Sequence, residues 1–123
     1  MIYVLYNPLA NSGRGETSAH ALDQRFSDTV PVYLDFISLD LASFFKTLPA
    51  ADMVILAGGD GTLNHFVNRL GGEIPAHEVY YYPAGSGNDF MRDAQSAAKN
   101  SLVLLNPYLQ NLPRLIHAHL ERR

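Results

Sequence analysis

The chain has 123 residues, of which 47% are hydrophobic and 17% charged, as expected for one soluble globular domain. Its formal net charge of −3 speaks against a nucleic-acid-binding surface, and the lack of cysteine excludes disulfides and thiolate metal sites. The apolar run from Met1 to Tyr6 has no basic lead-in and is too short for a signal core or a membrane span, so we expect a cytoplasmic protein.

Short apolar runs predict strands, and apolar residues at helical spacing predict helices between them. In chain order, the predicted elements are strand Ile2–Tyr6, helix Glu16–Phe26, strand Val30–Ile37, helix Leu41–Leu48, strand Met53–Ala57, a helix from Thr62 to Leu70, and strand Glu78–Tyr82. Strands that alternate with single helices are typical of βαβ units. The predicted fold class is therefore α/β, with a parallel sheet covered by helices on both faces.

Ligands of such sheets bind beyond the carboxyl ends of the strands. Three loops leave those ends, namely Asn7–Gly15, Gly58–Gly61 and Pro83–Asn88, and all three are rich in Gly, Asn, Ser and Pro. Glycines let a backbone approach a ligand closely, and the free amides at the start of a helix favour an anion. The sequence therefore predicts one phosphate-binding site, built from three loops along one edge of the sheet.

The middle loop, Gly-Gly-Asp-Gly-Thr at residues 58–62, carries the most specific signal. Asp60 stands at the start of the predicted helix, where a carboxylate could simply cap free amides. Capping does not require a glycine on either side, whereas a carboxylate beside phosphate-binding glycines suits a magnesium ion. We interpret Asp60 as a magnesium ligand and keep the helix cap as the alternative.

A dinucleotide fingerprint is almost matched by Gly13-x-Gly15-x-x-Ser18, with Asp35 at the place of a ribose-binding acid. That fingerprint begins where its strand ends, however, and six residues separate Gly13 from Tyr6. Its third glycine is also replaced by Ser18. This interpretation is disfavoured.

The three loops together resemble the diacylglycerol kinase catalytic-domain family, which includes bacterial lipid kinases and sphingosine kinases. The motifs that carry the resemblance are Asn7-Pro8 with Ser12-Gly13, then Gly58-Gly59-Asp60-Gly61-Thr62, then Pro83-x-Gly85-Ser86-Gly87-Asn88-Asp89-Phe90. They occur in the order found in the family. Ser86 stands where the family more often has threonine, and it keeps the hydroxyl.

The resemblance implies a nucleotide-binding domain similar to those of phosphofructokinases and NAD kinases, with ATP and Mg²⁺ as cofactors. The implied nucleotide-binding residues are Asn7, Pro8, Ser12, Gly13, Gly58, Gly59, Gly61, Thr62, Gly85, Ser86, Gly87 and Asn88. Asp60 and Asp89 are the implied magnesium ligands, and Asp60 also organises the phosphates for catalysis. The implied reaction transfers the γ-phosphoryl group of ATP to the hydroxyl of a diacylglycerol-like lipid in phospholipid biosynthesis, with peripheral membrane contact at most.

The resemblance also implies a second, mostly β domain that carries the lipid pocket and the general base, and that domain is expected to be absent from this chain. We therefore expect an ATP-binding domain at residues 1–100, a crossover segment at 101–123, and an isolated chain without kinase activity. Apolar residues in the crossover segment, from Leu102 to Leu120, further predict a homodimer. Two alternatives to a lipid kinase are a non-catalytic nucleotide-binding or assembly module and an enzyme similar to NAD kinase.

Overall fold

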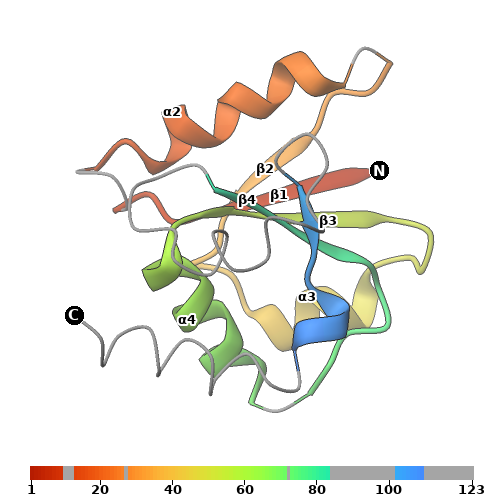
Figure 1. The fold of residues 1–123 in the computed structure, drawn as a ribbon. Coiled ribbons are helices and arrows are strands. Elements are labelled where there is room, and N and C mark those ends of the chain that lie inside the picture. The colour runs from red at the N-terminus through yellow and green to blue at the C-terminus, as the bar shows by residue number, and fades with distance from the viewer. Residues whose placement is uncertain (10–12, 27, 72, 84–101, 110–123) are drawn as a thin grey trace.

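A five-stranded sheet forms the centre of the protein in the computed structural model, which describes residues 1–9, 13–26, 28–71, 73–83 and 102–109 (Figure 1). The strands lie in the order β2-β1-β3-β4-β5. Their bounds are β1 Ile2–Tyr6, β2 Val32–Asp35, β3 Met53–Gly58, β4 Val79–Pro83 and β5 Val103–Leu104. The first four strands pair in parallel, as predicted, whereas β5 runs antiparallel to β4. The α/β class with a parallel sheet is confirmed, and β5 adds an antiparallel edge strand that was not predicted.

All described helices but the last, η3, follow predicted segments, with shifted ends. The helices are α2 Gly15–Ala19, which continues as the 3₁₀ helix η1 His20–Arg25, then α3 Leu41–Thr47, α4 Asp60–Leu70, and the 3₁₀ helix η3 Asn106–Tyr108. Asp40 precedes α3 and accepts a hydrogen bond from the amide of Ser43 (3.3 Å), which satisfies one of the free amides of that helix. Helix α4 ends at Gly71, whose φ of 62° is left-handed and suits glycine.

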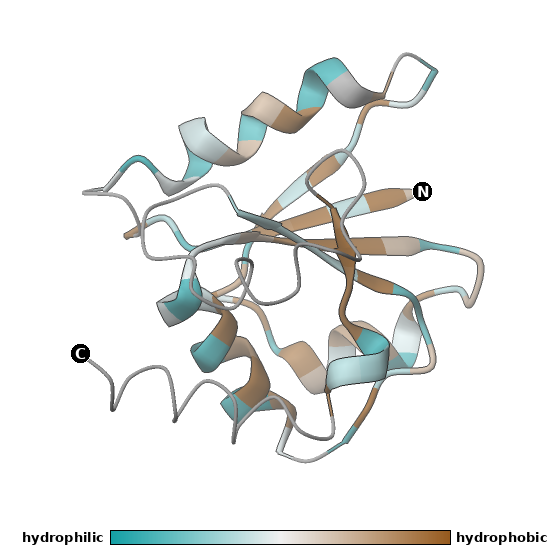
Figure 2. Cartoon of the chain, in the orientation of Figure 1, coloured by the Kyte–Doolittle hydropathy of each residue, from teal (hydrophilic) through white to brown (hydrophobic). Residues whose placement is uncertain are grey.

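Two separate cores lie on the two faces of the sheet. Helix α2 covers one face, and α3 and α4 cover the other (Figure 1). The smaller core contains Val4, Ala19, Leu22, Ile55 and Ala57. The larger core holds Leu5, Phe36, Leu63, Phe66 and Tyr81, among others. Figure 2 shows the hydrophobic residues concentrated along the strands and alternating with hydrophilic ones on α4, so the predicted two-sided burial is confirmed.

Residues 103–109 contribute to the larger core, whereas Leu102 packs against the smaller one. Val103, Leu105 and Leu109 are 1%, 0% and 6% exposed, and Asn106 fastens this segment to the start of β4. Its side-chain oxygen accepts from the amide of Val79 (2.8 Å), and its side-chain nitrogen donates to the carbonyl of His77 (2.8 Å). The predicted domain ends at residue 100, and the core of the sheet includes residues that follow this boundary. Val103, Leu105 and Leu109 pack inside the chain, whereas Leu102 and Leu104 are half-buried, and the homodimer stays a prediction.

The rest of the predicted crossover, residues 110–123, lies outside the described residues. Within the described part of the chain, no helix combines the length and hydrophobicity that a membrane span requires.

Candidate functional site

The strand register brings two of the three predicted loops to one edge of the sheet. Tyr6 pairs with Ala57, and Gly58 pairs with Pro83, so β1, β3 and β4 all end at the same level. The loop after β1 and the turn after β3 are therefore neighbours. Most of the third loop lies outside the described residues, and with it the predicted site residues Gly85, Ser86, Gly87, Asn88 and Asp89. Ser12 in the first loop also lies outside them.

The loop after β1 is shaped by a hydrogen bond from its backbone to the side chain of Asn7 and by two glycines. The side-chain oxygen of Asn7 accepts a hydrogen bond from the amide of Leu9 (2.9 Å), which turns the chain directly after the strand. Gly13 has a φ of 84°, which side chains disfavour, and among the described residues no atom lies within 4 Å of a Cβ built there. Gly15 is buried, and a Cβ there would lie 1.7 Å from the carbonyl oxygen of Asn7. The first turn of α2 therefore packs directly on the end of β1.

The turn after β3 places a carboxylate where α4 begins. Gly59 is the N-cap residue of α4, in an extended conformation (φ −107°, ψ −166°), and Asp60 is the first helical residue. Asp60 thus occupies the first helical position rather than the N-cap position. Its side chain is only 5% exposed, which is unusual for a carboxylate.

Gly58 and Gly61, which precede and follow Asp60, have different surroundings. A Cβ at Gly58 would lie 2.5 Å from Oγ1 of Thr62, which is itself buried at 4% exposure. Gly58 thus allows α4 to pack closely on the end of β3. A Cβ at Gly61 would meet no atom of the described residues within 4 Å, and this residue is exposed. Only Gly61 of these two leaves open space in front of the turn.

Tyr81 contacts the turn after β3 from the interior of the protein. It lies in β4, is 0% exposed, and its hydroxyl donates to the carbonyl oxygen of Gly58 (3.0 Å). Burial raises the pKa of Tyr81 far above its usual value, and the negative charge of Asp60 raises it further. Sequence reasoning missed this residue. The available signal was the alternation of a strand, which turns Tyr81 to the face opposite to that of Tyr80 and Tyr82.

The sequence profile of the diacylglycerol kinase catalytic domain matches residues 1–114. The chain belongs to this family. Two solved structures, both of a candidate diacylglycerol kinase from Bacillus anthracis strain Sterne, share the fold, each with 21% sequence identity and a TM-score of 0.50. The similarity covers 96% and 94% of this chain but only 41% and 38% of those chains. No curated protein matches the chain significantly in sequence.

Membership of the kinase family implies ATP and a divalent metal, and the residues at this edge fit both. Magnesium is usually held by one or two carboxylates together with substrate phosphates, rather than by a cage of protein ligands. Asp60 supplies one buried carboxylate at the right edge. Among the described residues, no three His, Asp or Glu side chains gather into a metal-binding group. The open space in front of Gly13 and Gly61 suits a ligand that approaches the backbone closely.

The disfavoured dinucleotide interpretation gains nothing from Asp35. Its carboxylate closes the turn after β2, since Oδ1 accepts from the amide of Ile37 (2.9 Å) and Oδ2 accepts from the hydroxyl of Ser38 (3.1 Å). The side chain is thus occupied in shaping its own loop.

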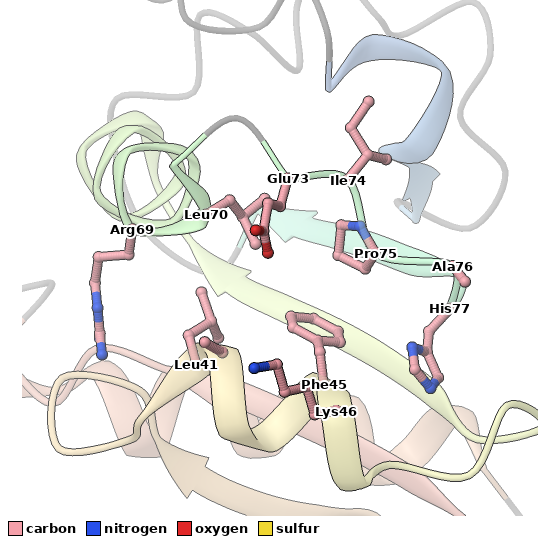
Figure 3. Close-up of a pocket in the computed structure, with 11 residues that line it drawn as sticks. Leu41, Phe45, Lys46, Arg69, Leu70, Glu73, Ile74, Pro75, Ala76 and His77 are labelled. Carbon is pink, nitrogen blue, oxygen red and sulfur yellow. The ribbon is translucent and has the colours of Figure 1, made fainter.

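A separate pocket of about 210 Å³ lies near the end of α4 that is remote from Asp60 (Figure 3). Residues of α3, the end of α4 and the segment 73–77 line it, including Leu41, Phe45 and His77. The imidazole Nε2 of His77 donates to the carbonyl of Leu48 (2.8 Å), and its buried Nδ1 has no partner among the described residues. This pocket lies before β4, at the amino end of that strand, and is not part of the predicted phosphate site.

Proposed function

We propose that this kinase-family chain binds Mg-ATP at the carboxyl edge of its sheet, and that the full-length protein transfers the γ-phosphoryl group to a lipid hydroxyl. The observation that carries the proposal is a buried carboxylate, Asp60, beside a glycine with open space in front of it, Gly61. Family membership supports the reaction class.

The proposed roles follow from the places of the residues. Asp60 holds the metal, together with Asp89 from the third loop. Thr62 is 4% exposed and is proposed to line the phosphates together with the glycines of its turn. The remaining proposed phosphate and nucleotide contacts are Asn7, Pro8, Ser12, Gly13, Gly58, Gly59, Gly61, Gly85, Ser86, Gly87 and Asn88.

Phosphoryl transfer requires little covalent chemistry from a protein, because positioning and neutralisation of charge supply most of the catalysis. When bound, the magnesium ion neutralises charge on the phosphate oxygens. Asp60 contributes a fixed negative charge at a buried position, and the first amides of α4 present partial positive charge at the same end of the helix. Both are in place before the nucleotide arrives, so neither must reorganise during the reaction.

The proposal has two levels, because the chain spans about two fifths of the length of the two solved structures that it resembles. For this chain alone, we propose nucleotide binding without phosphoryl transfer. For the full-length protein, we propose transfer to a diacylglycerol-like lipid at a membrane surface. The cytoplasm is the proposed location.

Calorimetric titration of the 123-residue chain with Mg-ATP tests the first level. Asp60→Asn should weaken binding of Mg-ATP about tenfold, or about 1.4 kcal/mol, because the variant keeps the size of the side chain but loses the charged carboxylate that holds the metal. Asp52→Asn is the matched control, because Asp52 flanks the same strand at its opposite end and pairs with the N-terminal amine (3.1 Å). Equal affinities for the two variants would remove Asp60 from the site.

Phosphoryl transfer in mixed micelles tests the second level. The full-length protein should label diacylglycerol from ATP, and its Asp60→Asn variant should not. Nucleotide binding without any transfer would favour a non-catalytic module, and labelling of NAD instead of a lipid would favour the NAD kinase alternative.

A further inference from the structure

The hydroxyl of Tyr81 makes a buried contact with the turn that carries Asp60. It donates to the carbonyl oxygen of Gly58 (3.0 Å), and the side chain of Tyr81 is 0% exposed. The neighbouring Tyr80 belongs to the other face of the sheet, where its hydroxyl makes a longer, exposed bond to Glu78 (3.4 Å). The two tyrosines are adjacent in one strand, yet the hydroxyl of Tyr81 binds the turn before α4 and the hydroxyl of Tyr80 binds an exposed carboxylate.

The accepting carbonyl lies at a sensitive point of the chain. Gly58 is the last residue of β3, and Gly59 and then Asp60 follow directly. Two consecutive glycines have more backbone freedom than any other pair of residues. A bond that fixes the carbonyl of the first glycine restricts the peptide plane between the two, and thereby the direction in which the chain enters α4.

Thr62 restrains the same turn from the other side. Its side chain fills the space where a Cβ of Gly58 would lie, and it is 4% exposed. Gly58 is thus held between a helix residue that packs against its Cα and a strand residue that binds its carbonyl. Asp60 lies between Gly58 and Thr62 in sequence, so these two contacts also restrict the backbone position of Asp60.

We propose that Tyr81 is a positioning residue, whose hydrogen bond to the Gly58 carbonyl sets the orientation of the Asp60 carboxylate toward the metal-nucleotide complex. This inference rests on the proposed function. Tyr81 does not touch the ligand itself, because its side chain is buried beneath the turn.

The test compares Tyr81→Phe with Tyr80→Phe, which loses the same hydroxyl on the opposite face. Affinity for ATP is measured twice, with Mg²⁺ and with EDTA, so that the gain in affinity from the metal is obtained for each protein. We expect Tyr81→Phe to reduce that metal-dependent gain about fivefold, within the range of coupling between residues of one network. Tyr80→Phe should leave it unchanged.

A purely structural role for Tyr81 predicts a different result. In that case Tyr81→Phe lowers the thermal midpoint and weakens binding equally with and without metal, which would overturn the proposal. An unchanged metal-dependent gain would do the same. In the Asp60→Asn background, Tyr81→Phe should have no further effect on the metal-dependent gain, since the carboxylate that it positions has gone.

Two further outcomes separate the proposals. If the wild-type chain does not bind Mg-ATP, the proposed function fails, and the role of Tyr81 fails with it. If the wild type binds and Tyr81→Phe behaves as Tyr80→Phe, only the positioning role fails. Should Tyr81→Phe not fold, 4-aminophenylalanine at this position keeps a weaker donor in the same place. Its metal-dependent gain should then lie below that of the wild type, and an equal value would overturn the inference.

Discussion

The turn after β1 and the turn after β3 leave neighbouring strands at the same edge of the sheet, yet they use glycine for different purposes. In the first, Gly15 lets a helix pack on the carbonyl of Asn7, and Gly13 takes up a left-handed φ of 84°. In the second, Gly58 makes room for a protein side chain, and Gly61 faces open space. A glycine-rich loop is therefore not by itself a phosphate loop. Substitution at each position can separate glycines that serve packing from glycines that serve a ligand.

The largest effect is expected at Gly15. A Cβ there would overlap the backbone oxygen of Asn7, which cannot rotate away. Gly15→Ala should therefore destabilise the chain by about 3 kcal/mol, at the upper end of the usual cost of overpacking. Urea denaturation followed by circular dichroism measures this. A loss of less than about 0.5 kcal/mol, the range of neutral surface substitutions, would mean that α2 does not pack on β1 as described.

Gly58→Ala should cost somewhat less, about 2 kcal/mol, because the overlapping atoms belong to a side chain, that of Thr62. The three nearest atoms are Oγ1, Cβ and Cγ2 of Thr62, and Thr62→Gly removes all three. The double variant should therefore be more stable than the sum of the two single losses predicts, by denaturation under the same conditions. Strict additivity would show that Gly58 and Thr62 do not oppose each other.

Gly61→Ala should act in the opposite direction on stability. The position is helical and exposed, and no atom of the described part of the chain lies within 4 Å of the added Cβ, so the substitution should stabilise the fold by about 0.5 kcal/mol. If a phosphate occupies the open space, the same methyl group should weaken Mg-ATP binding. A more stable variant with undiminished affinity in calorimetry would show that the nucleotide does not approach Gly61.

The tyrosines near the two turns, Tyr6 and Tyr81, should also ionise differently in alkaline solution, and neither should ionise at neutral pH. Burial raises the pKa of Tyr6, at the end of β1, with Glu16 and Asp35 adding to the shift, and burial raises that of Tyr81 much further. A raised tyrosine pKa contributes stability that is present below the unfolded value of about 10 and is lost as pH rises above it. Tyrosinate absorbance should therefore show Tyr6 ionising in the folded chain and Tyr81 ionising only with unfolding. Tyr6→Phe and Tyr81→Phe identify the two steps, and a common step for both would remove the distinction.

Much of this architecture is readable from local patterns. The apolar runs identified all four parallel strands to within two residues of each end, because a strand buried on both faces has little choice of residue type. The stripe from Leu63 to Leu70 identified α4, and Gly71 identified its end, since a left-handed residue there favours glycine. The motifs identified the family, which the match over residues 1–114 confirms. The predicted site residues remain a prediction.

The sequence by itself thus determined the α/β class, the order of the elements and the presence of glycine-rich turns at strand ends, because each depends on residues close together in the chain. Only the tertiary structure decided which neighbour each glycine meets and that Asp60 follows the N-cap residue of α4. It also decided that the segment 102–109 adds an antiparallel edge strand to the sheet. It also brought Tyr81 beneath Gly58, across a separation of 23 residues. A strand pattern shows which face a side chain takes, but its partner on that face depends on which strands become neighbours and in what register.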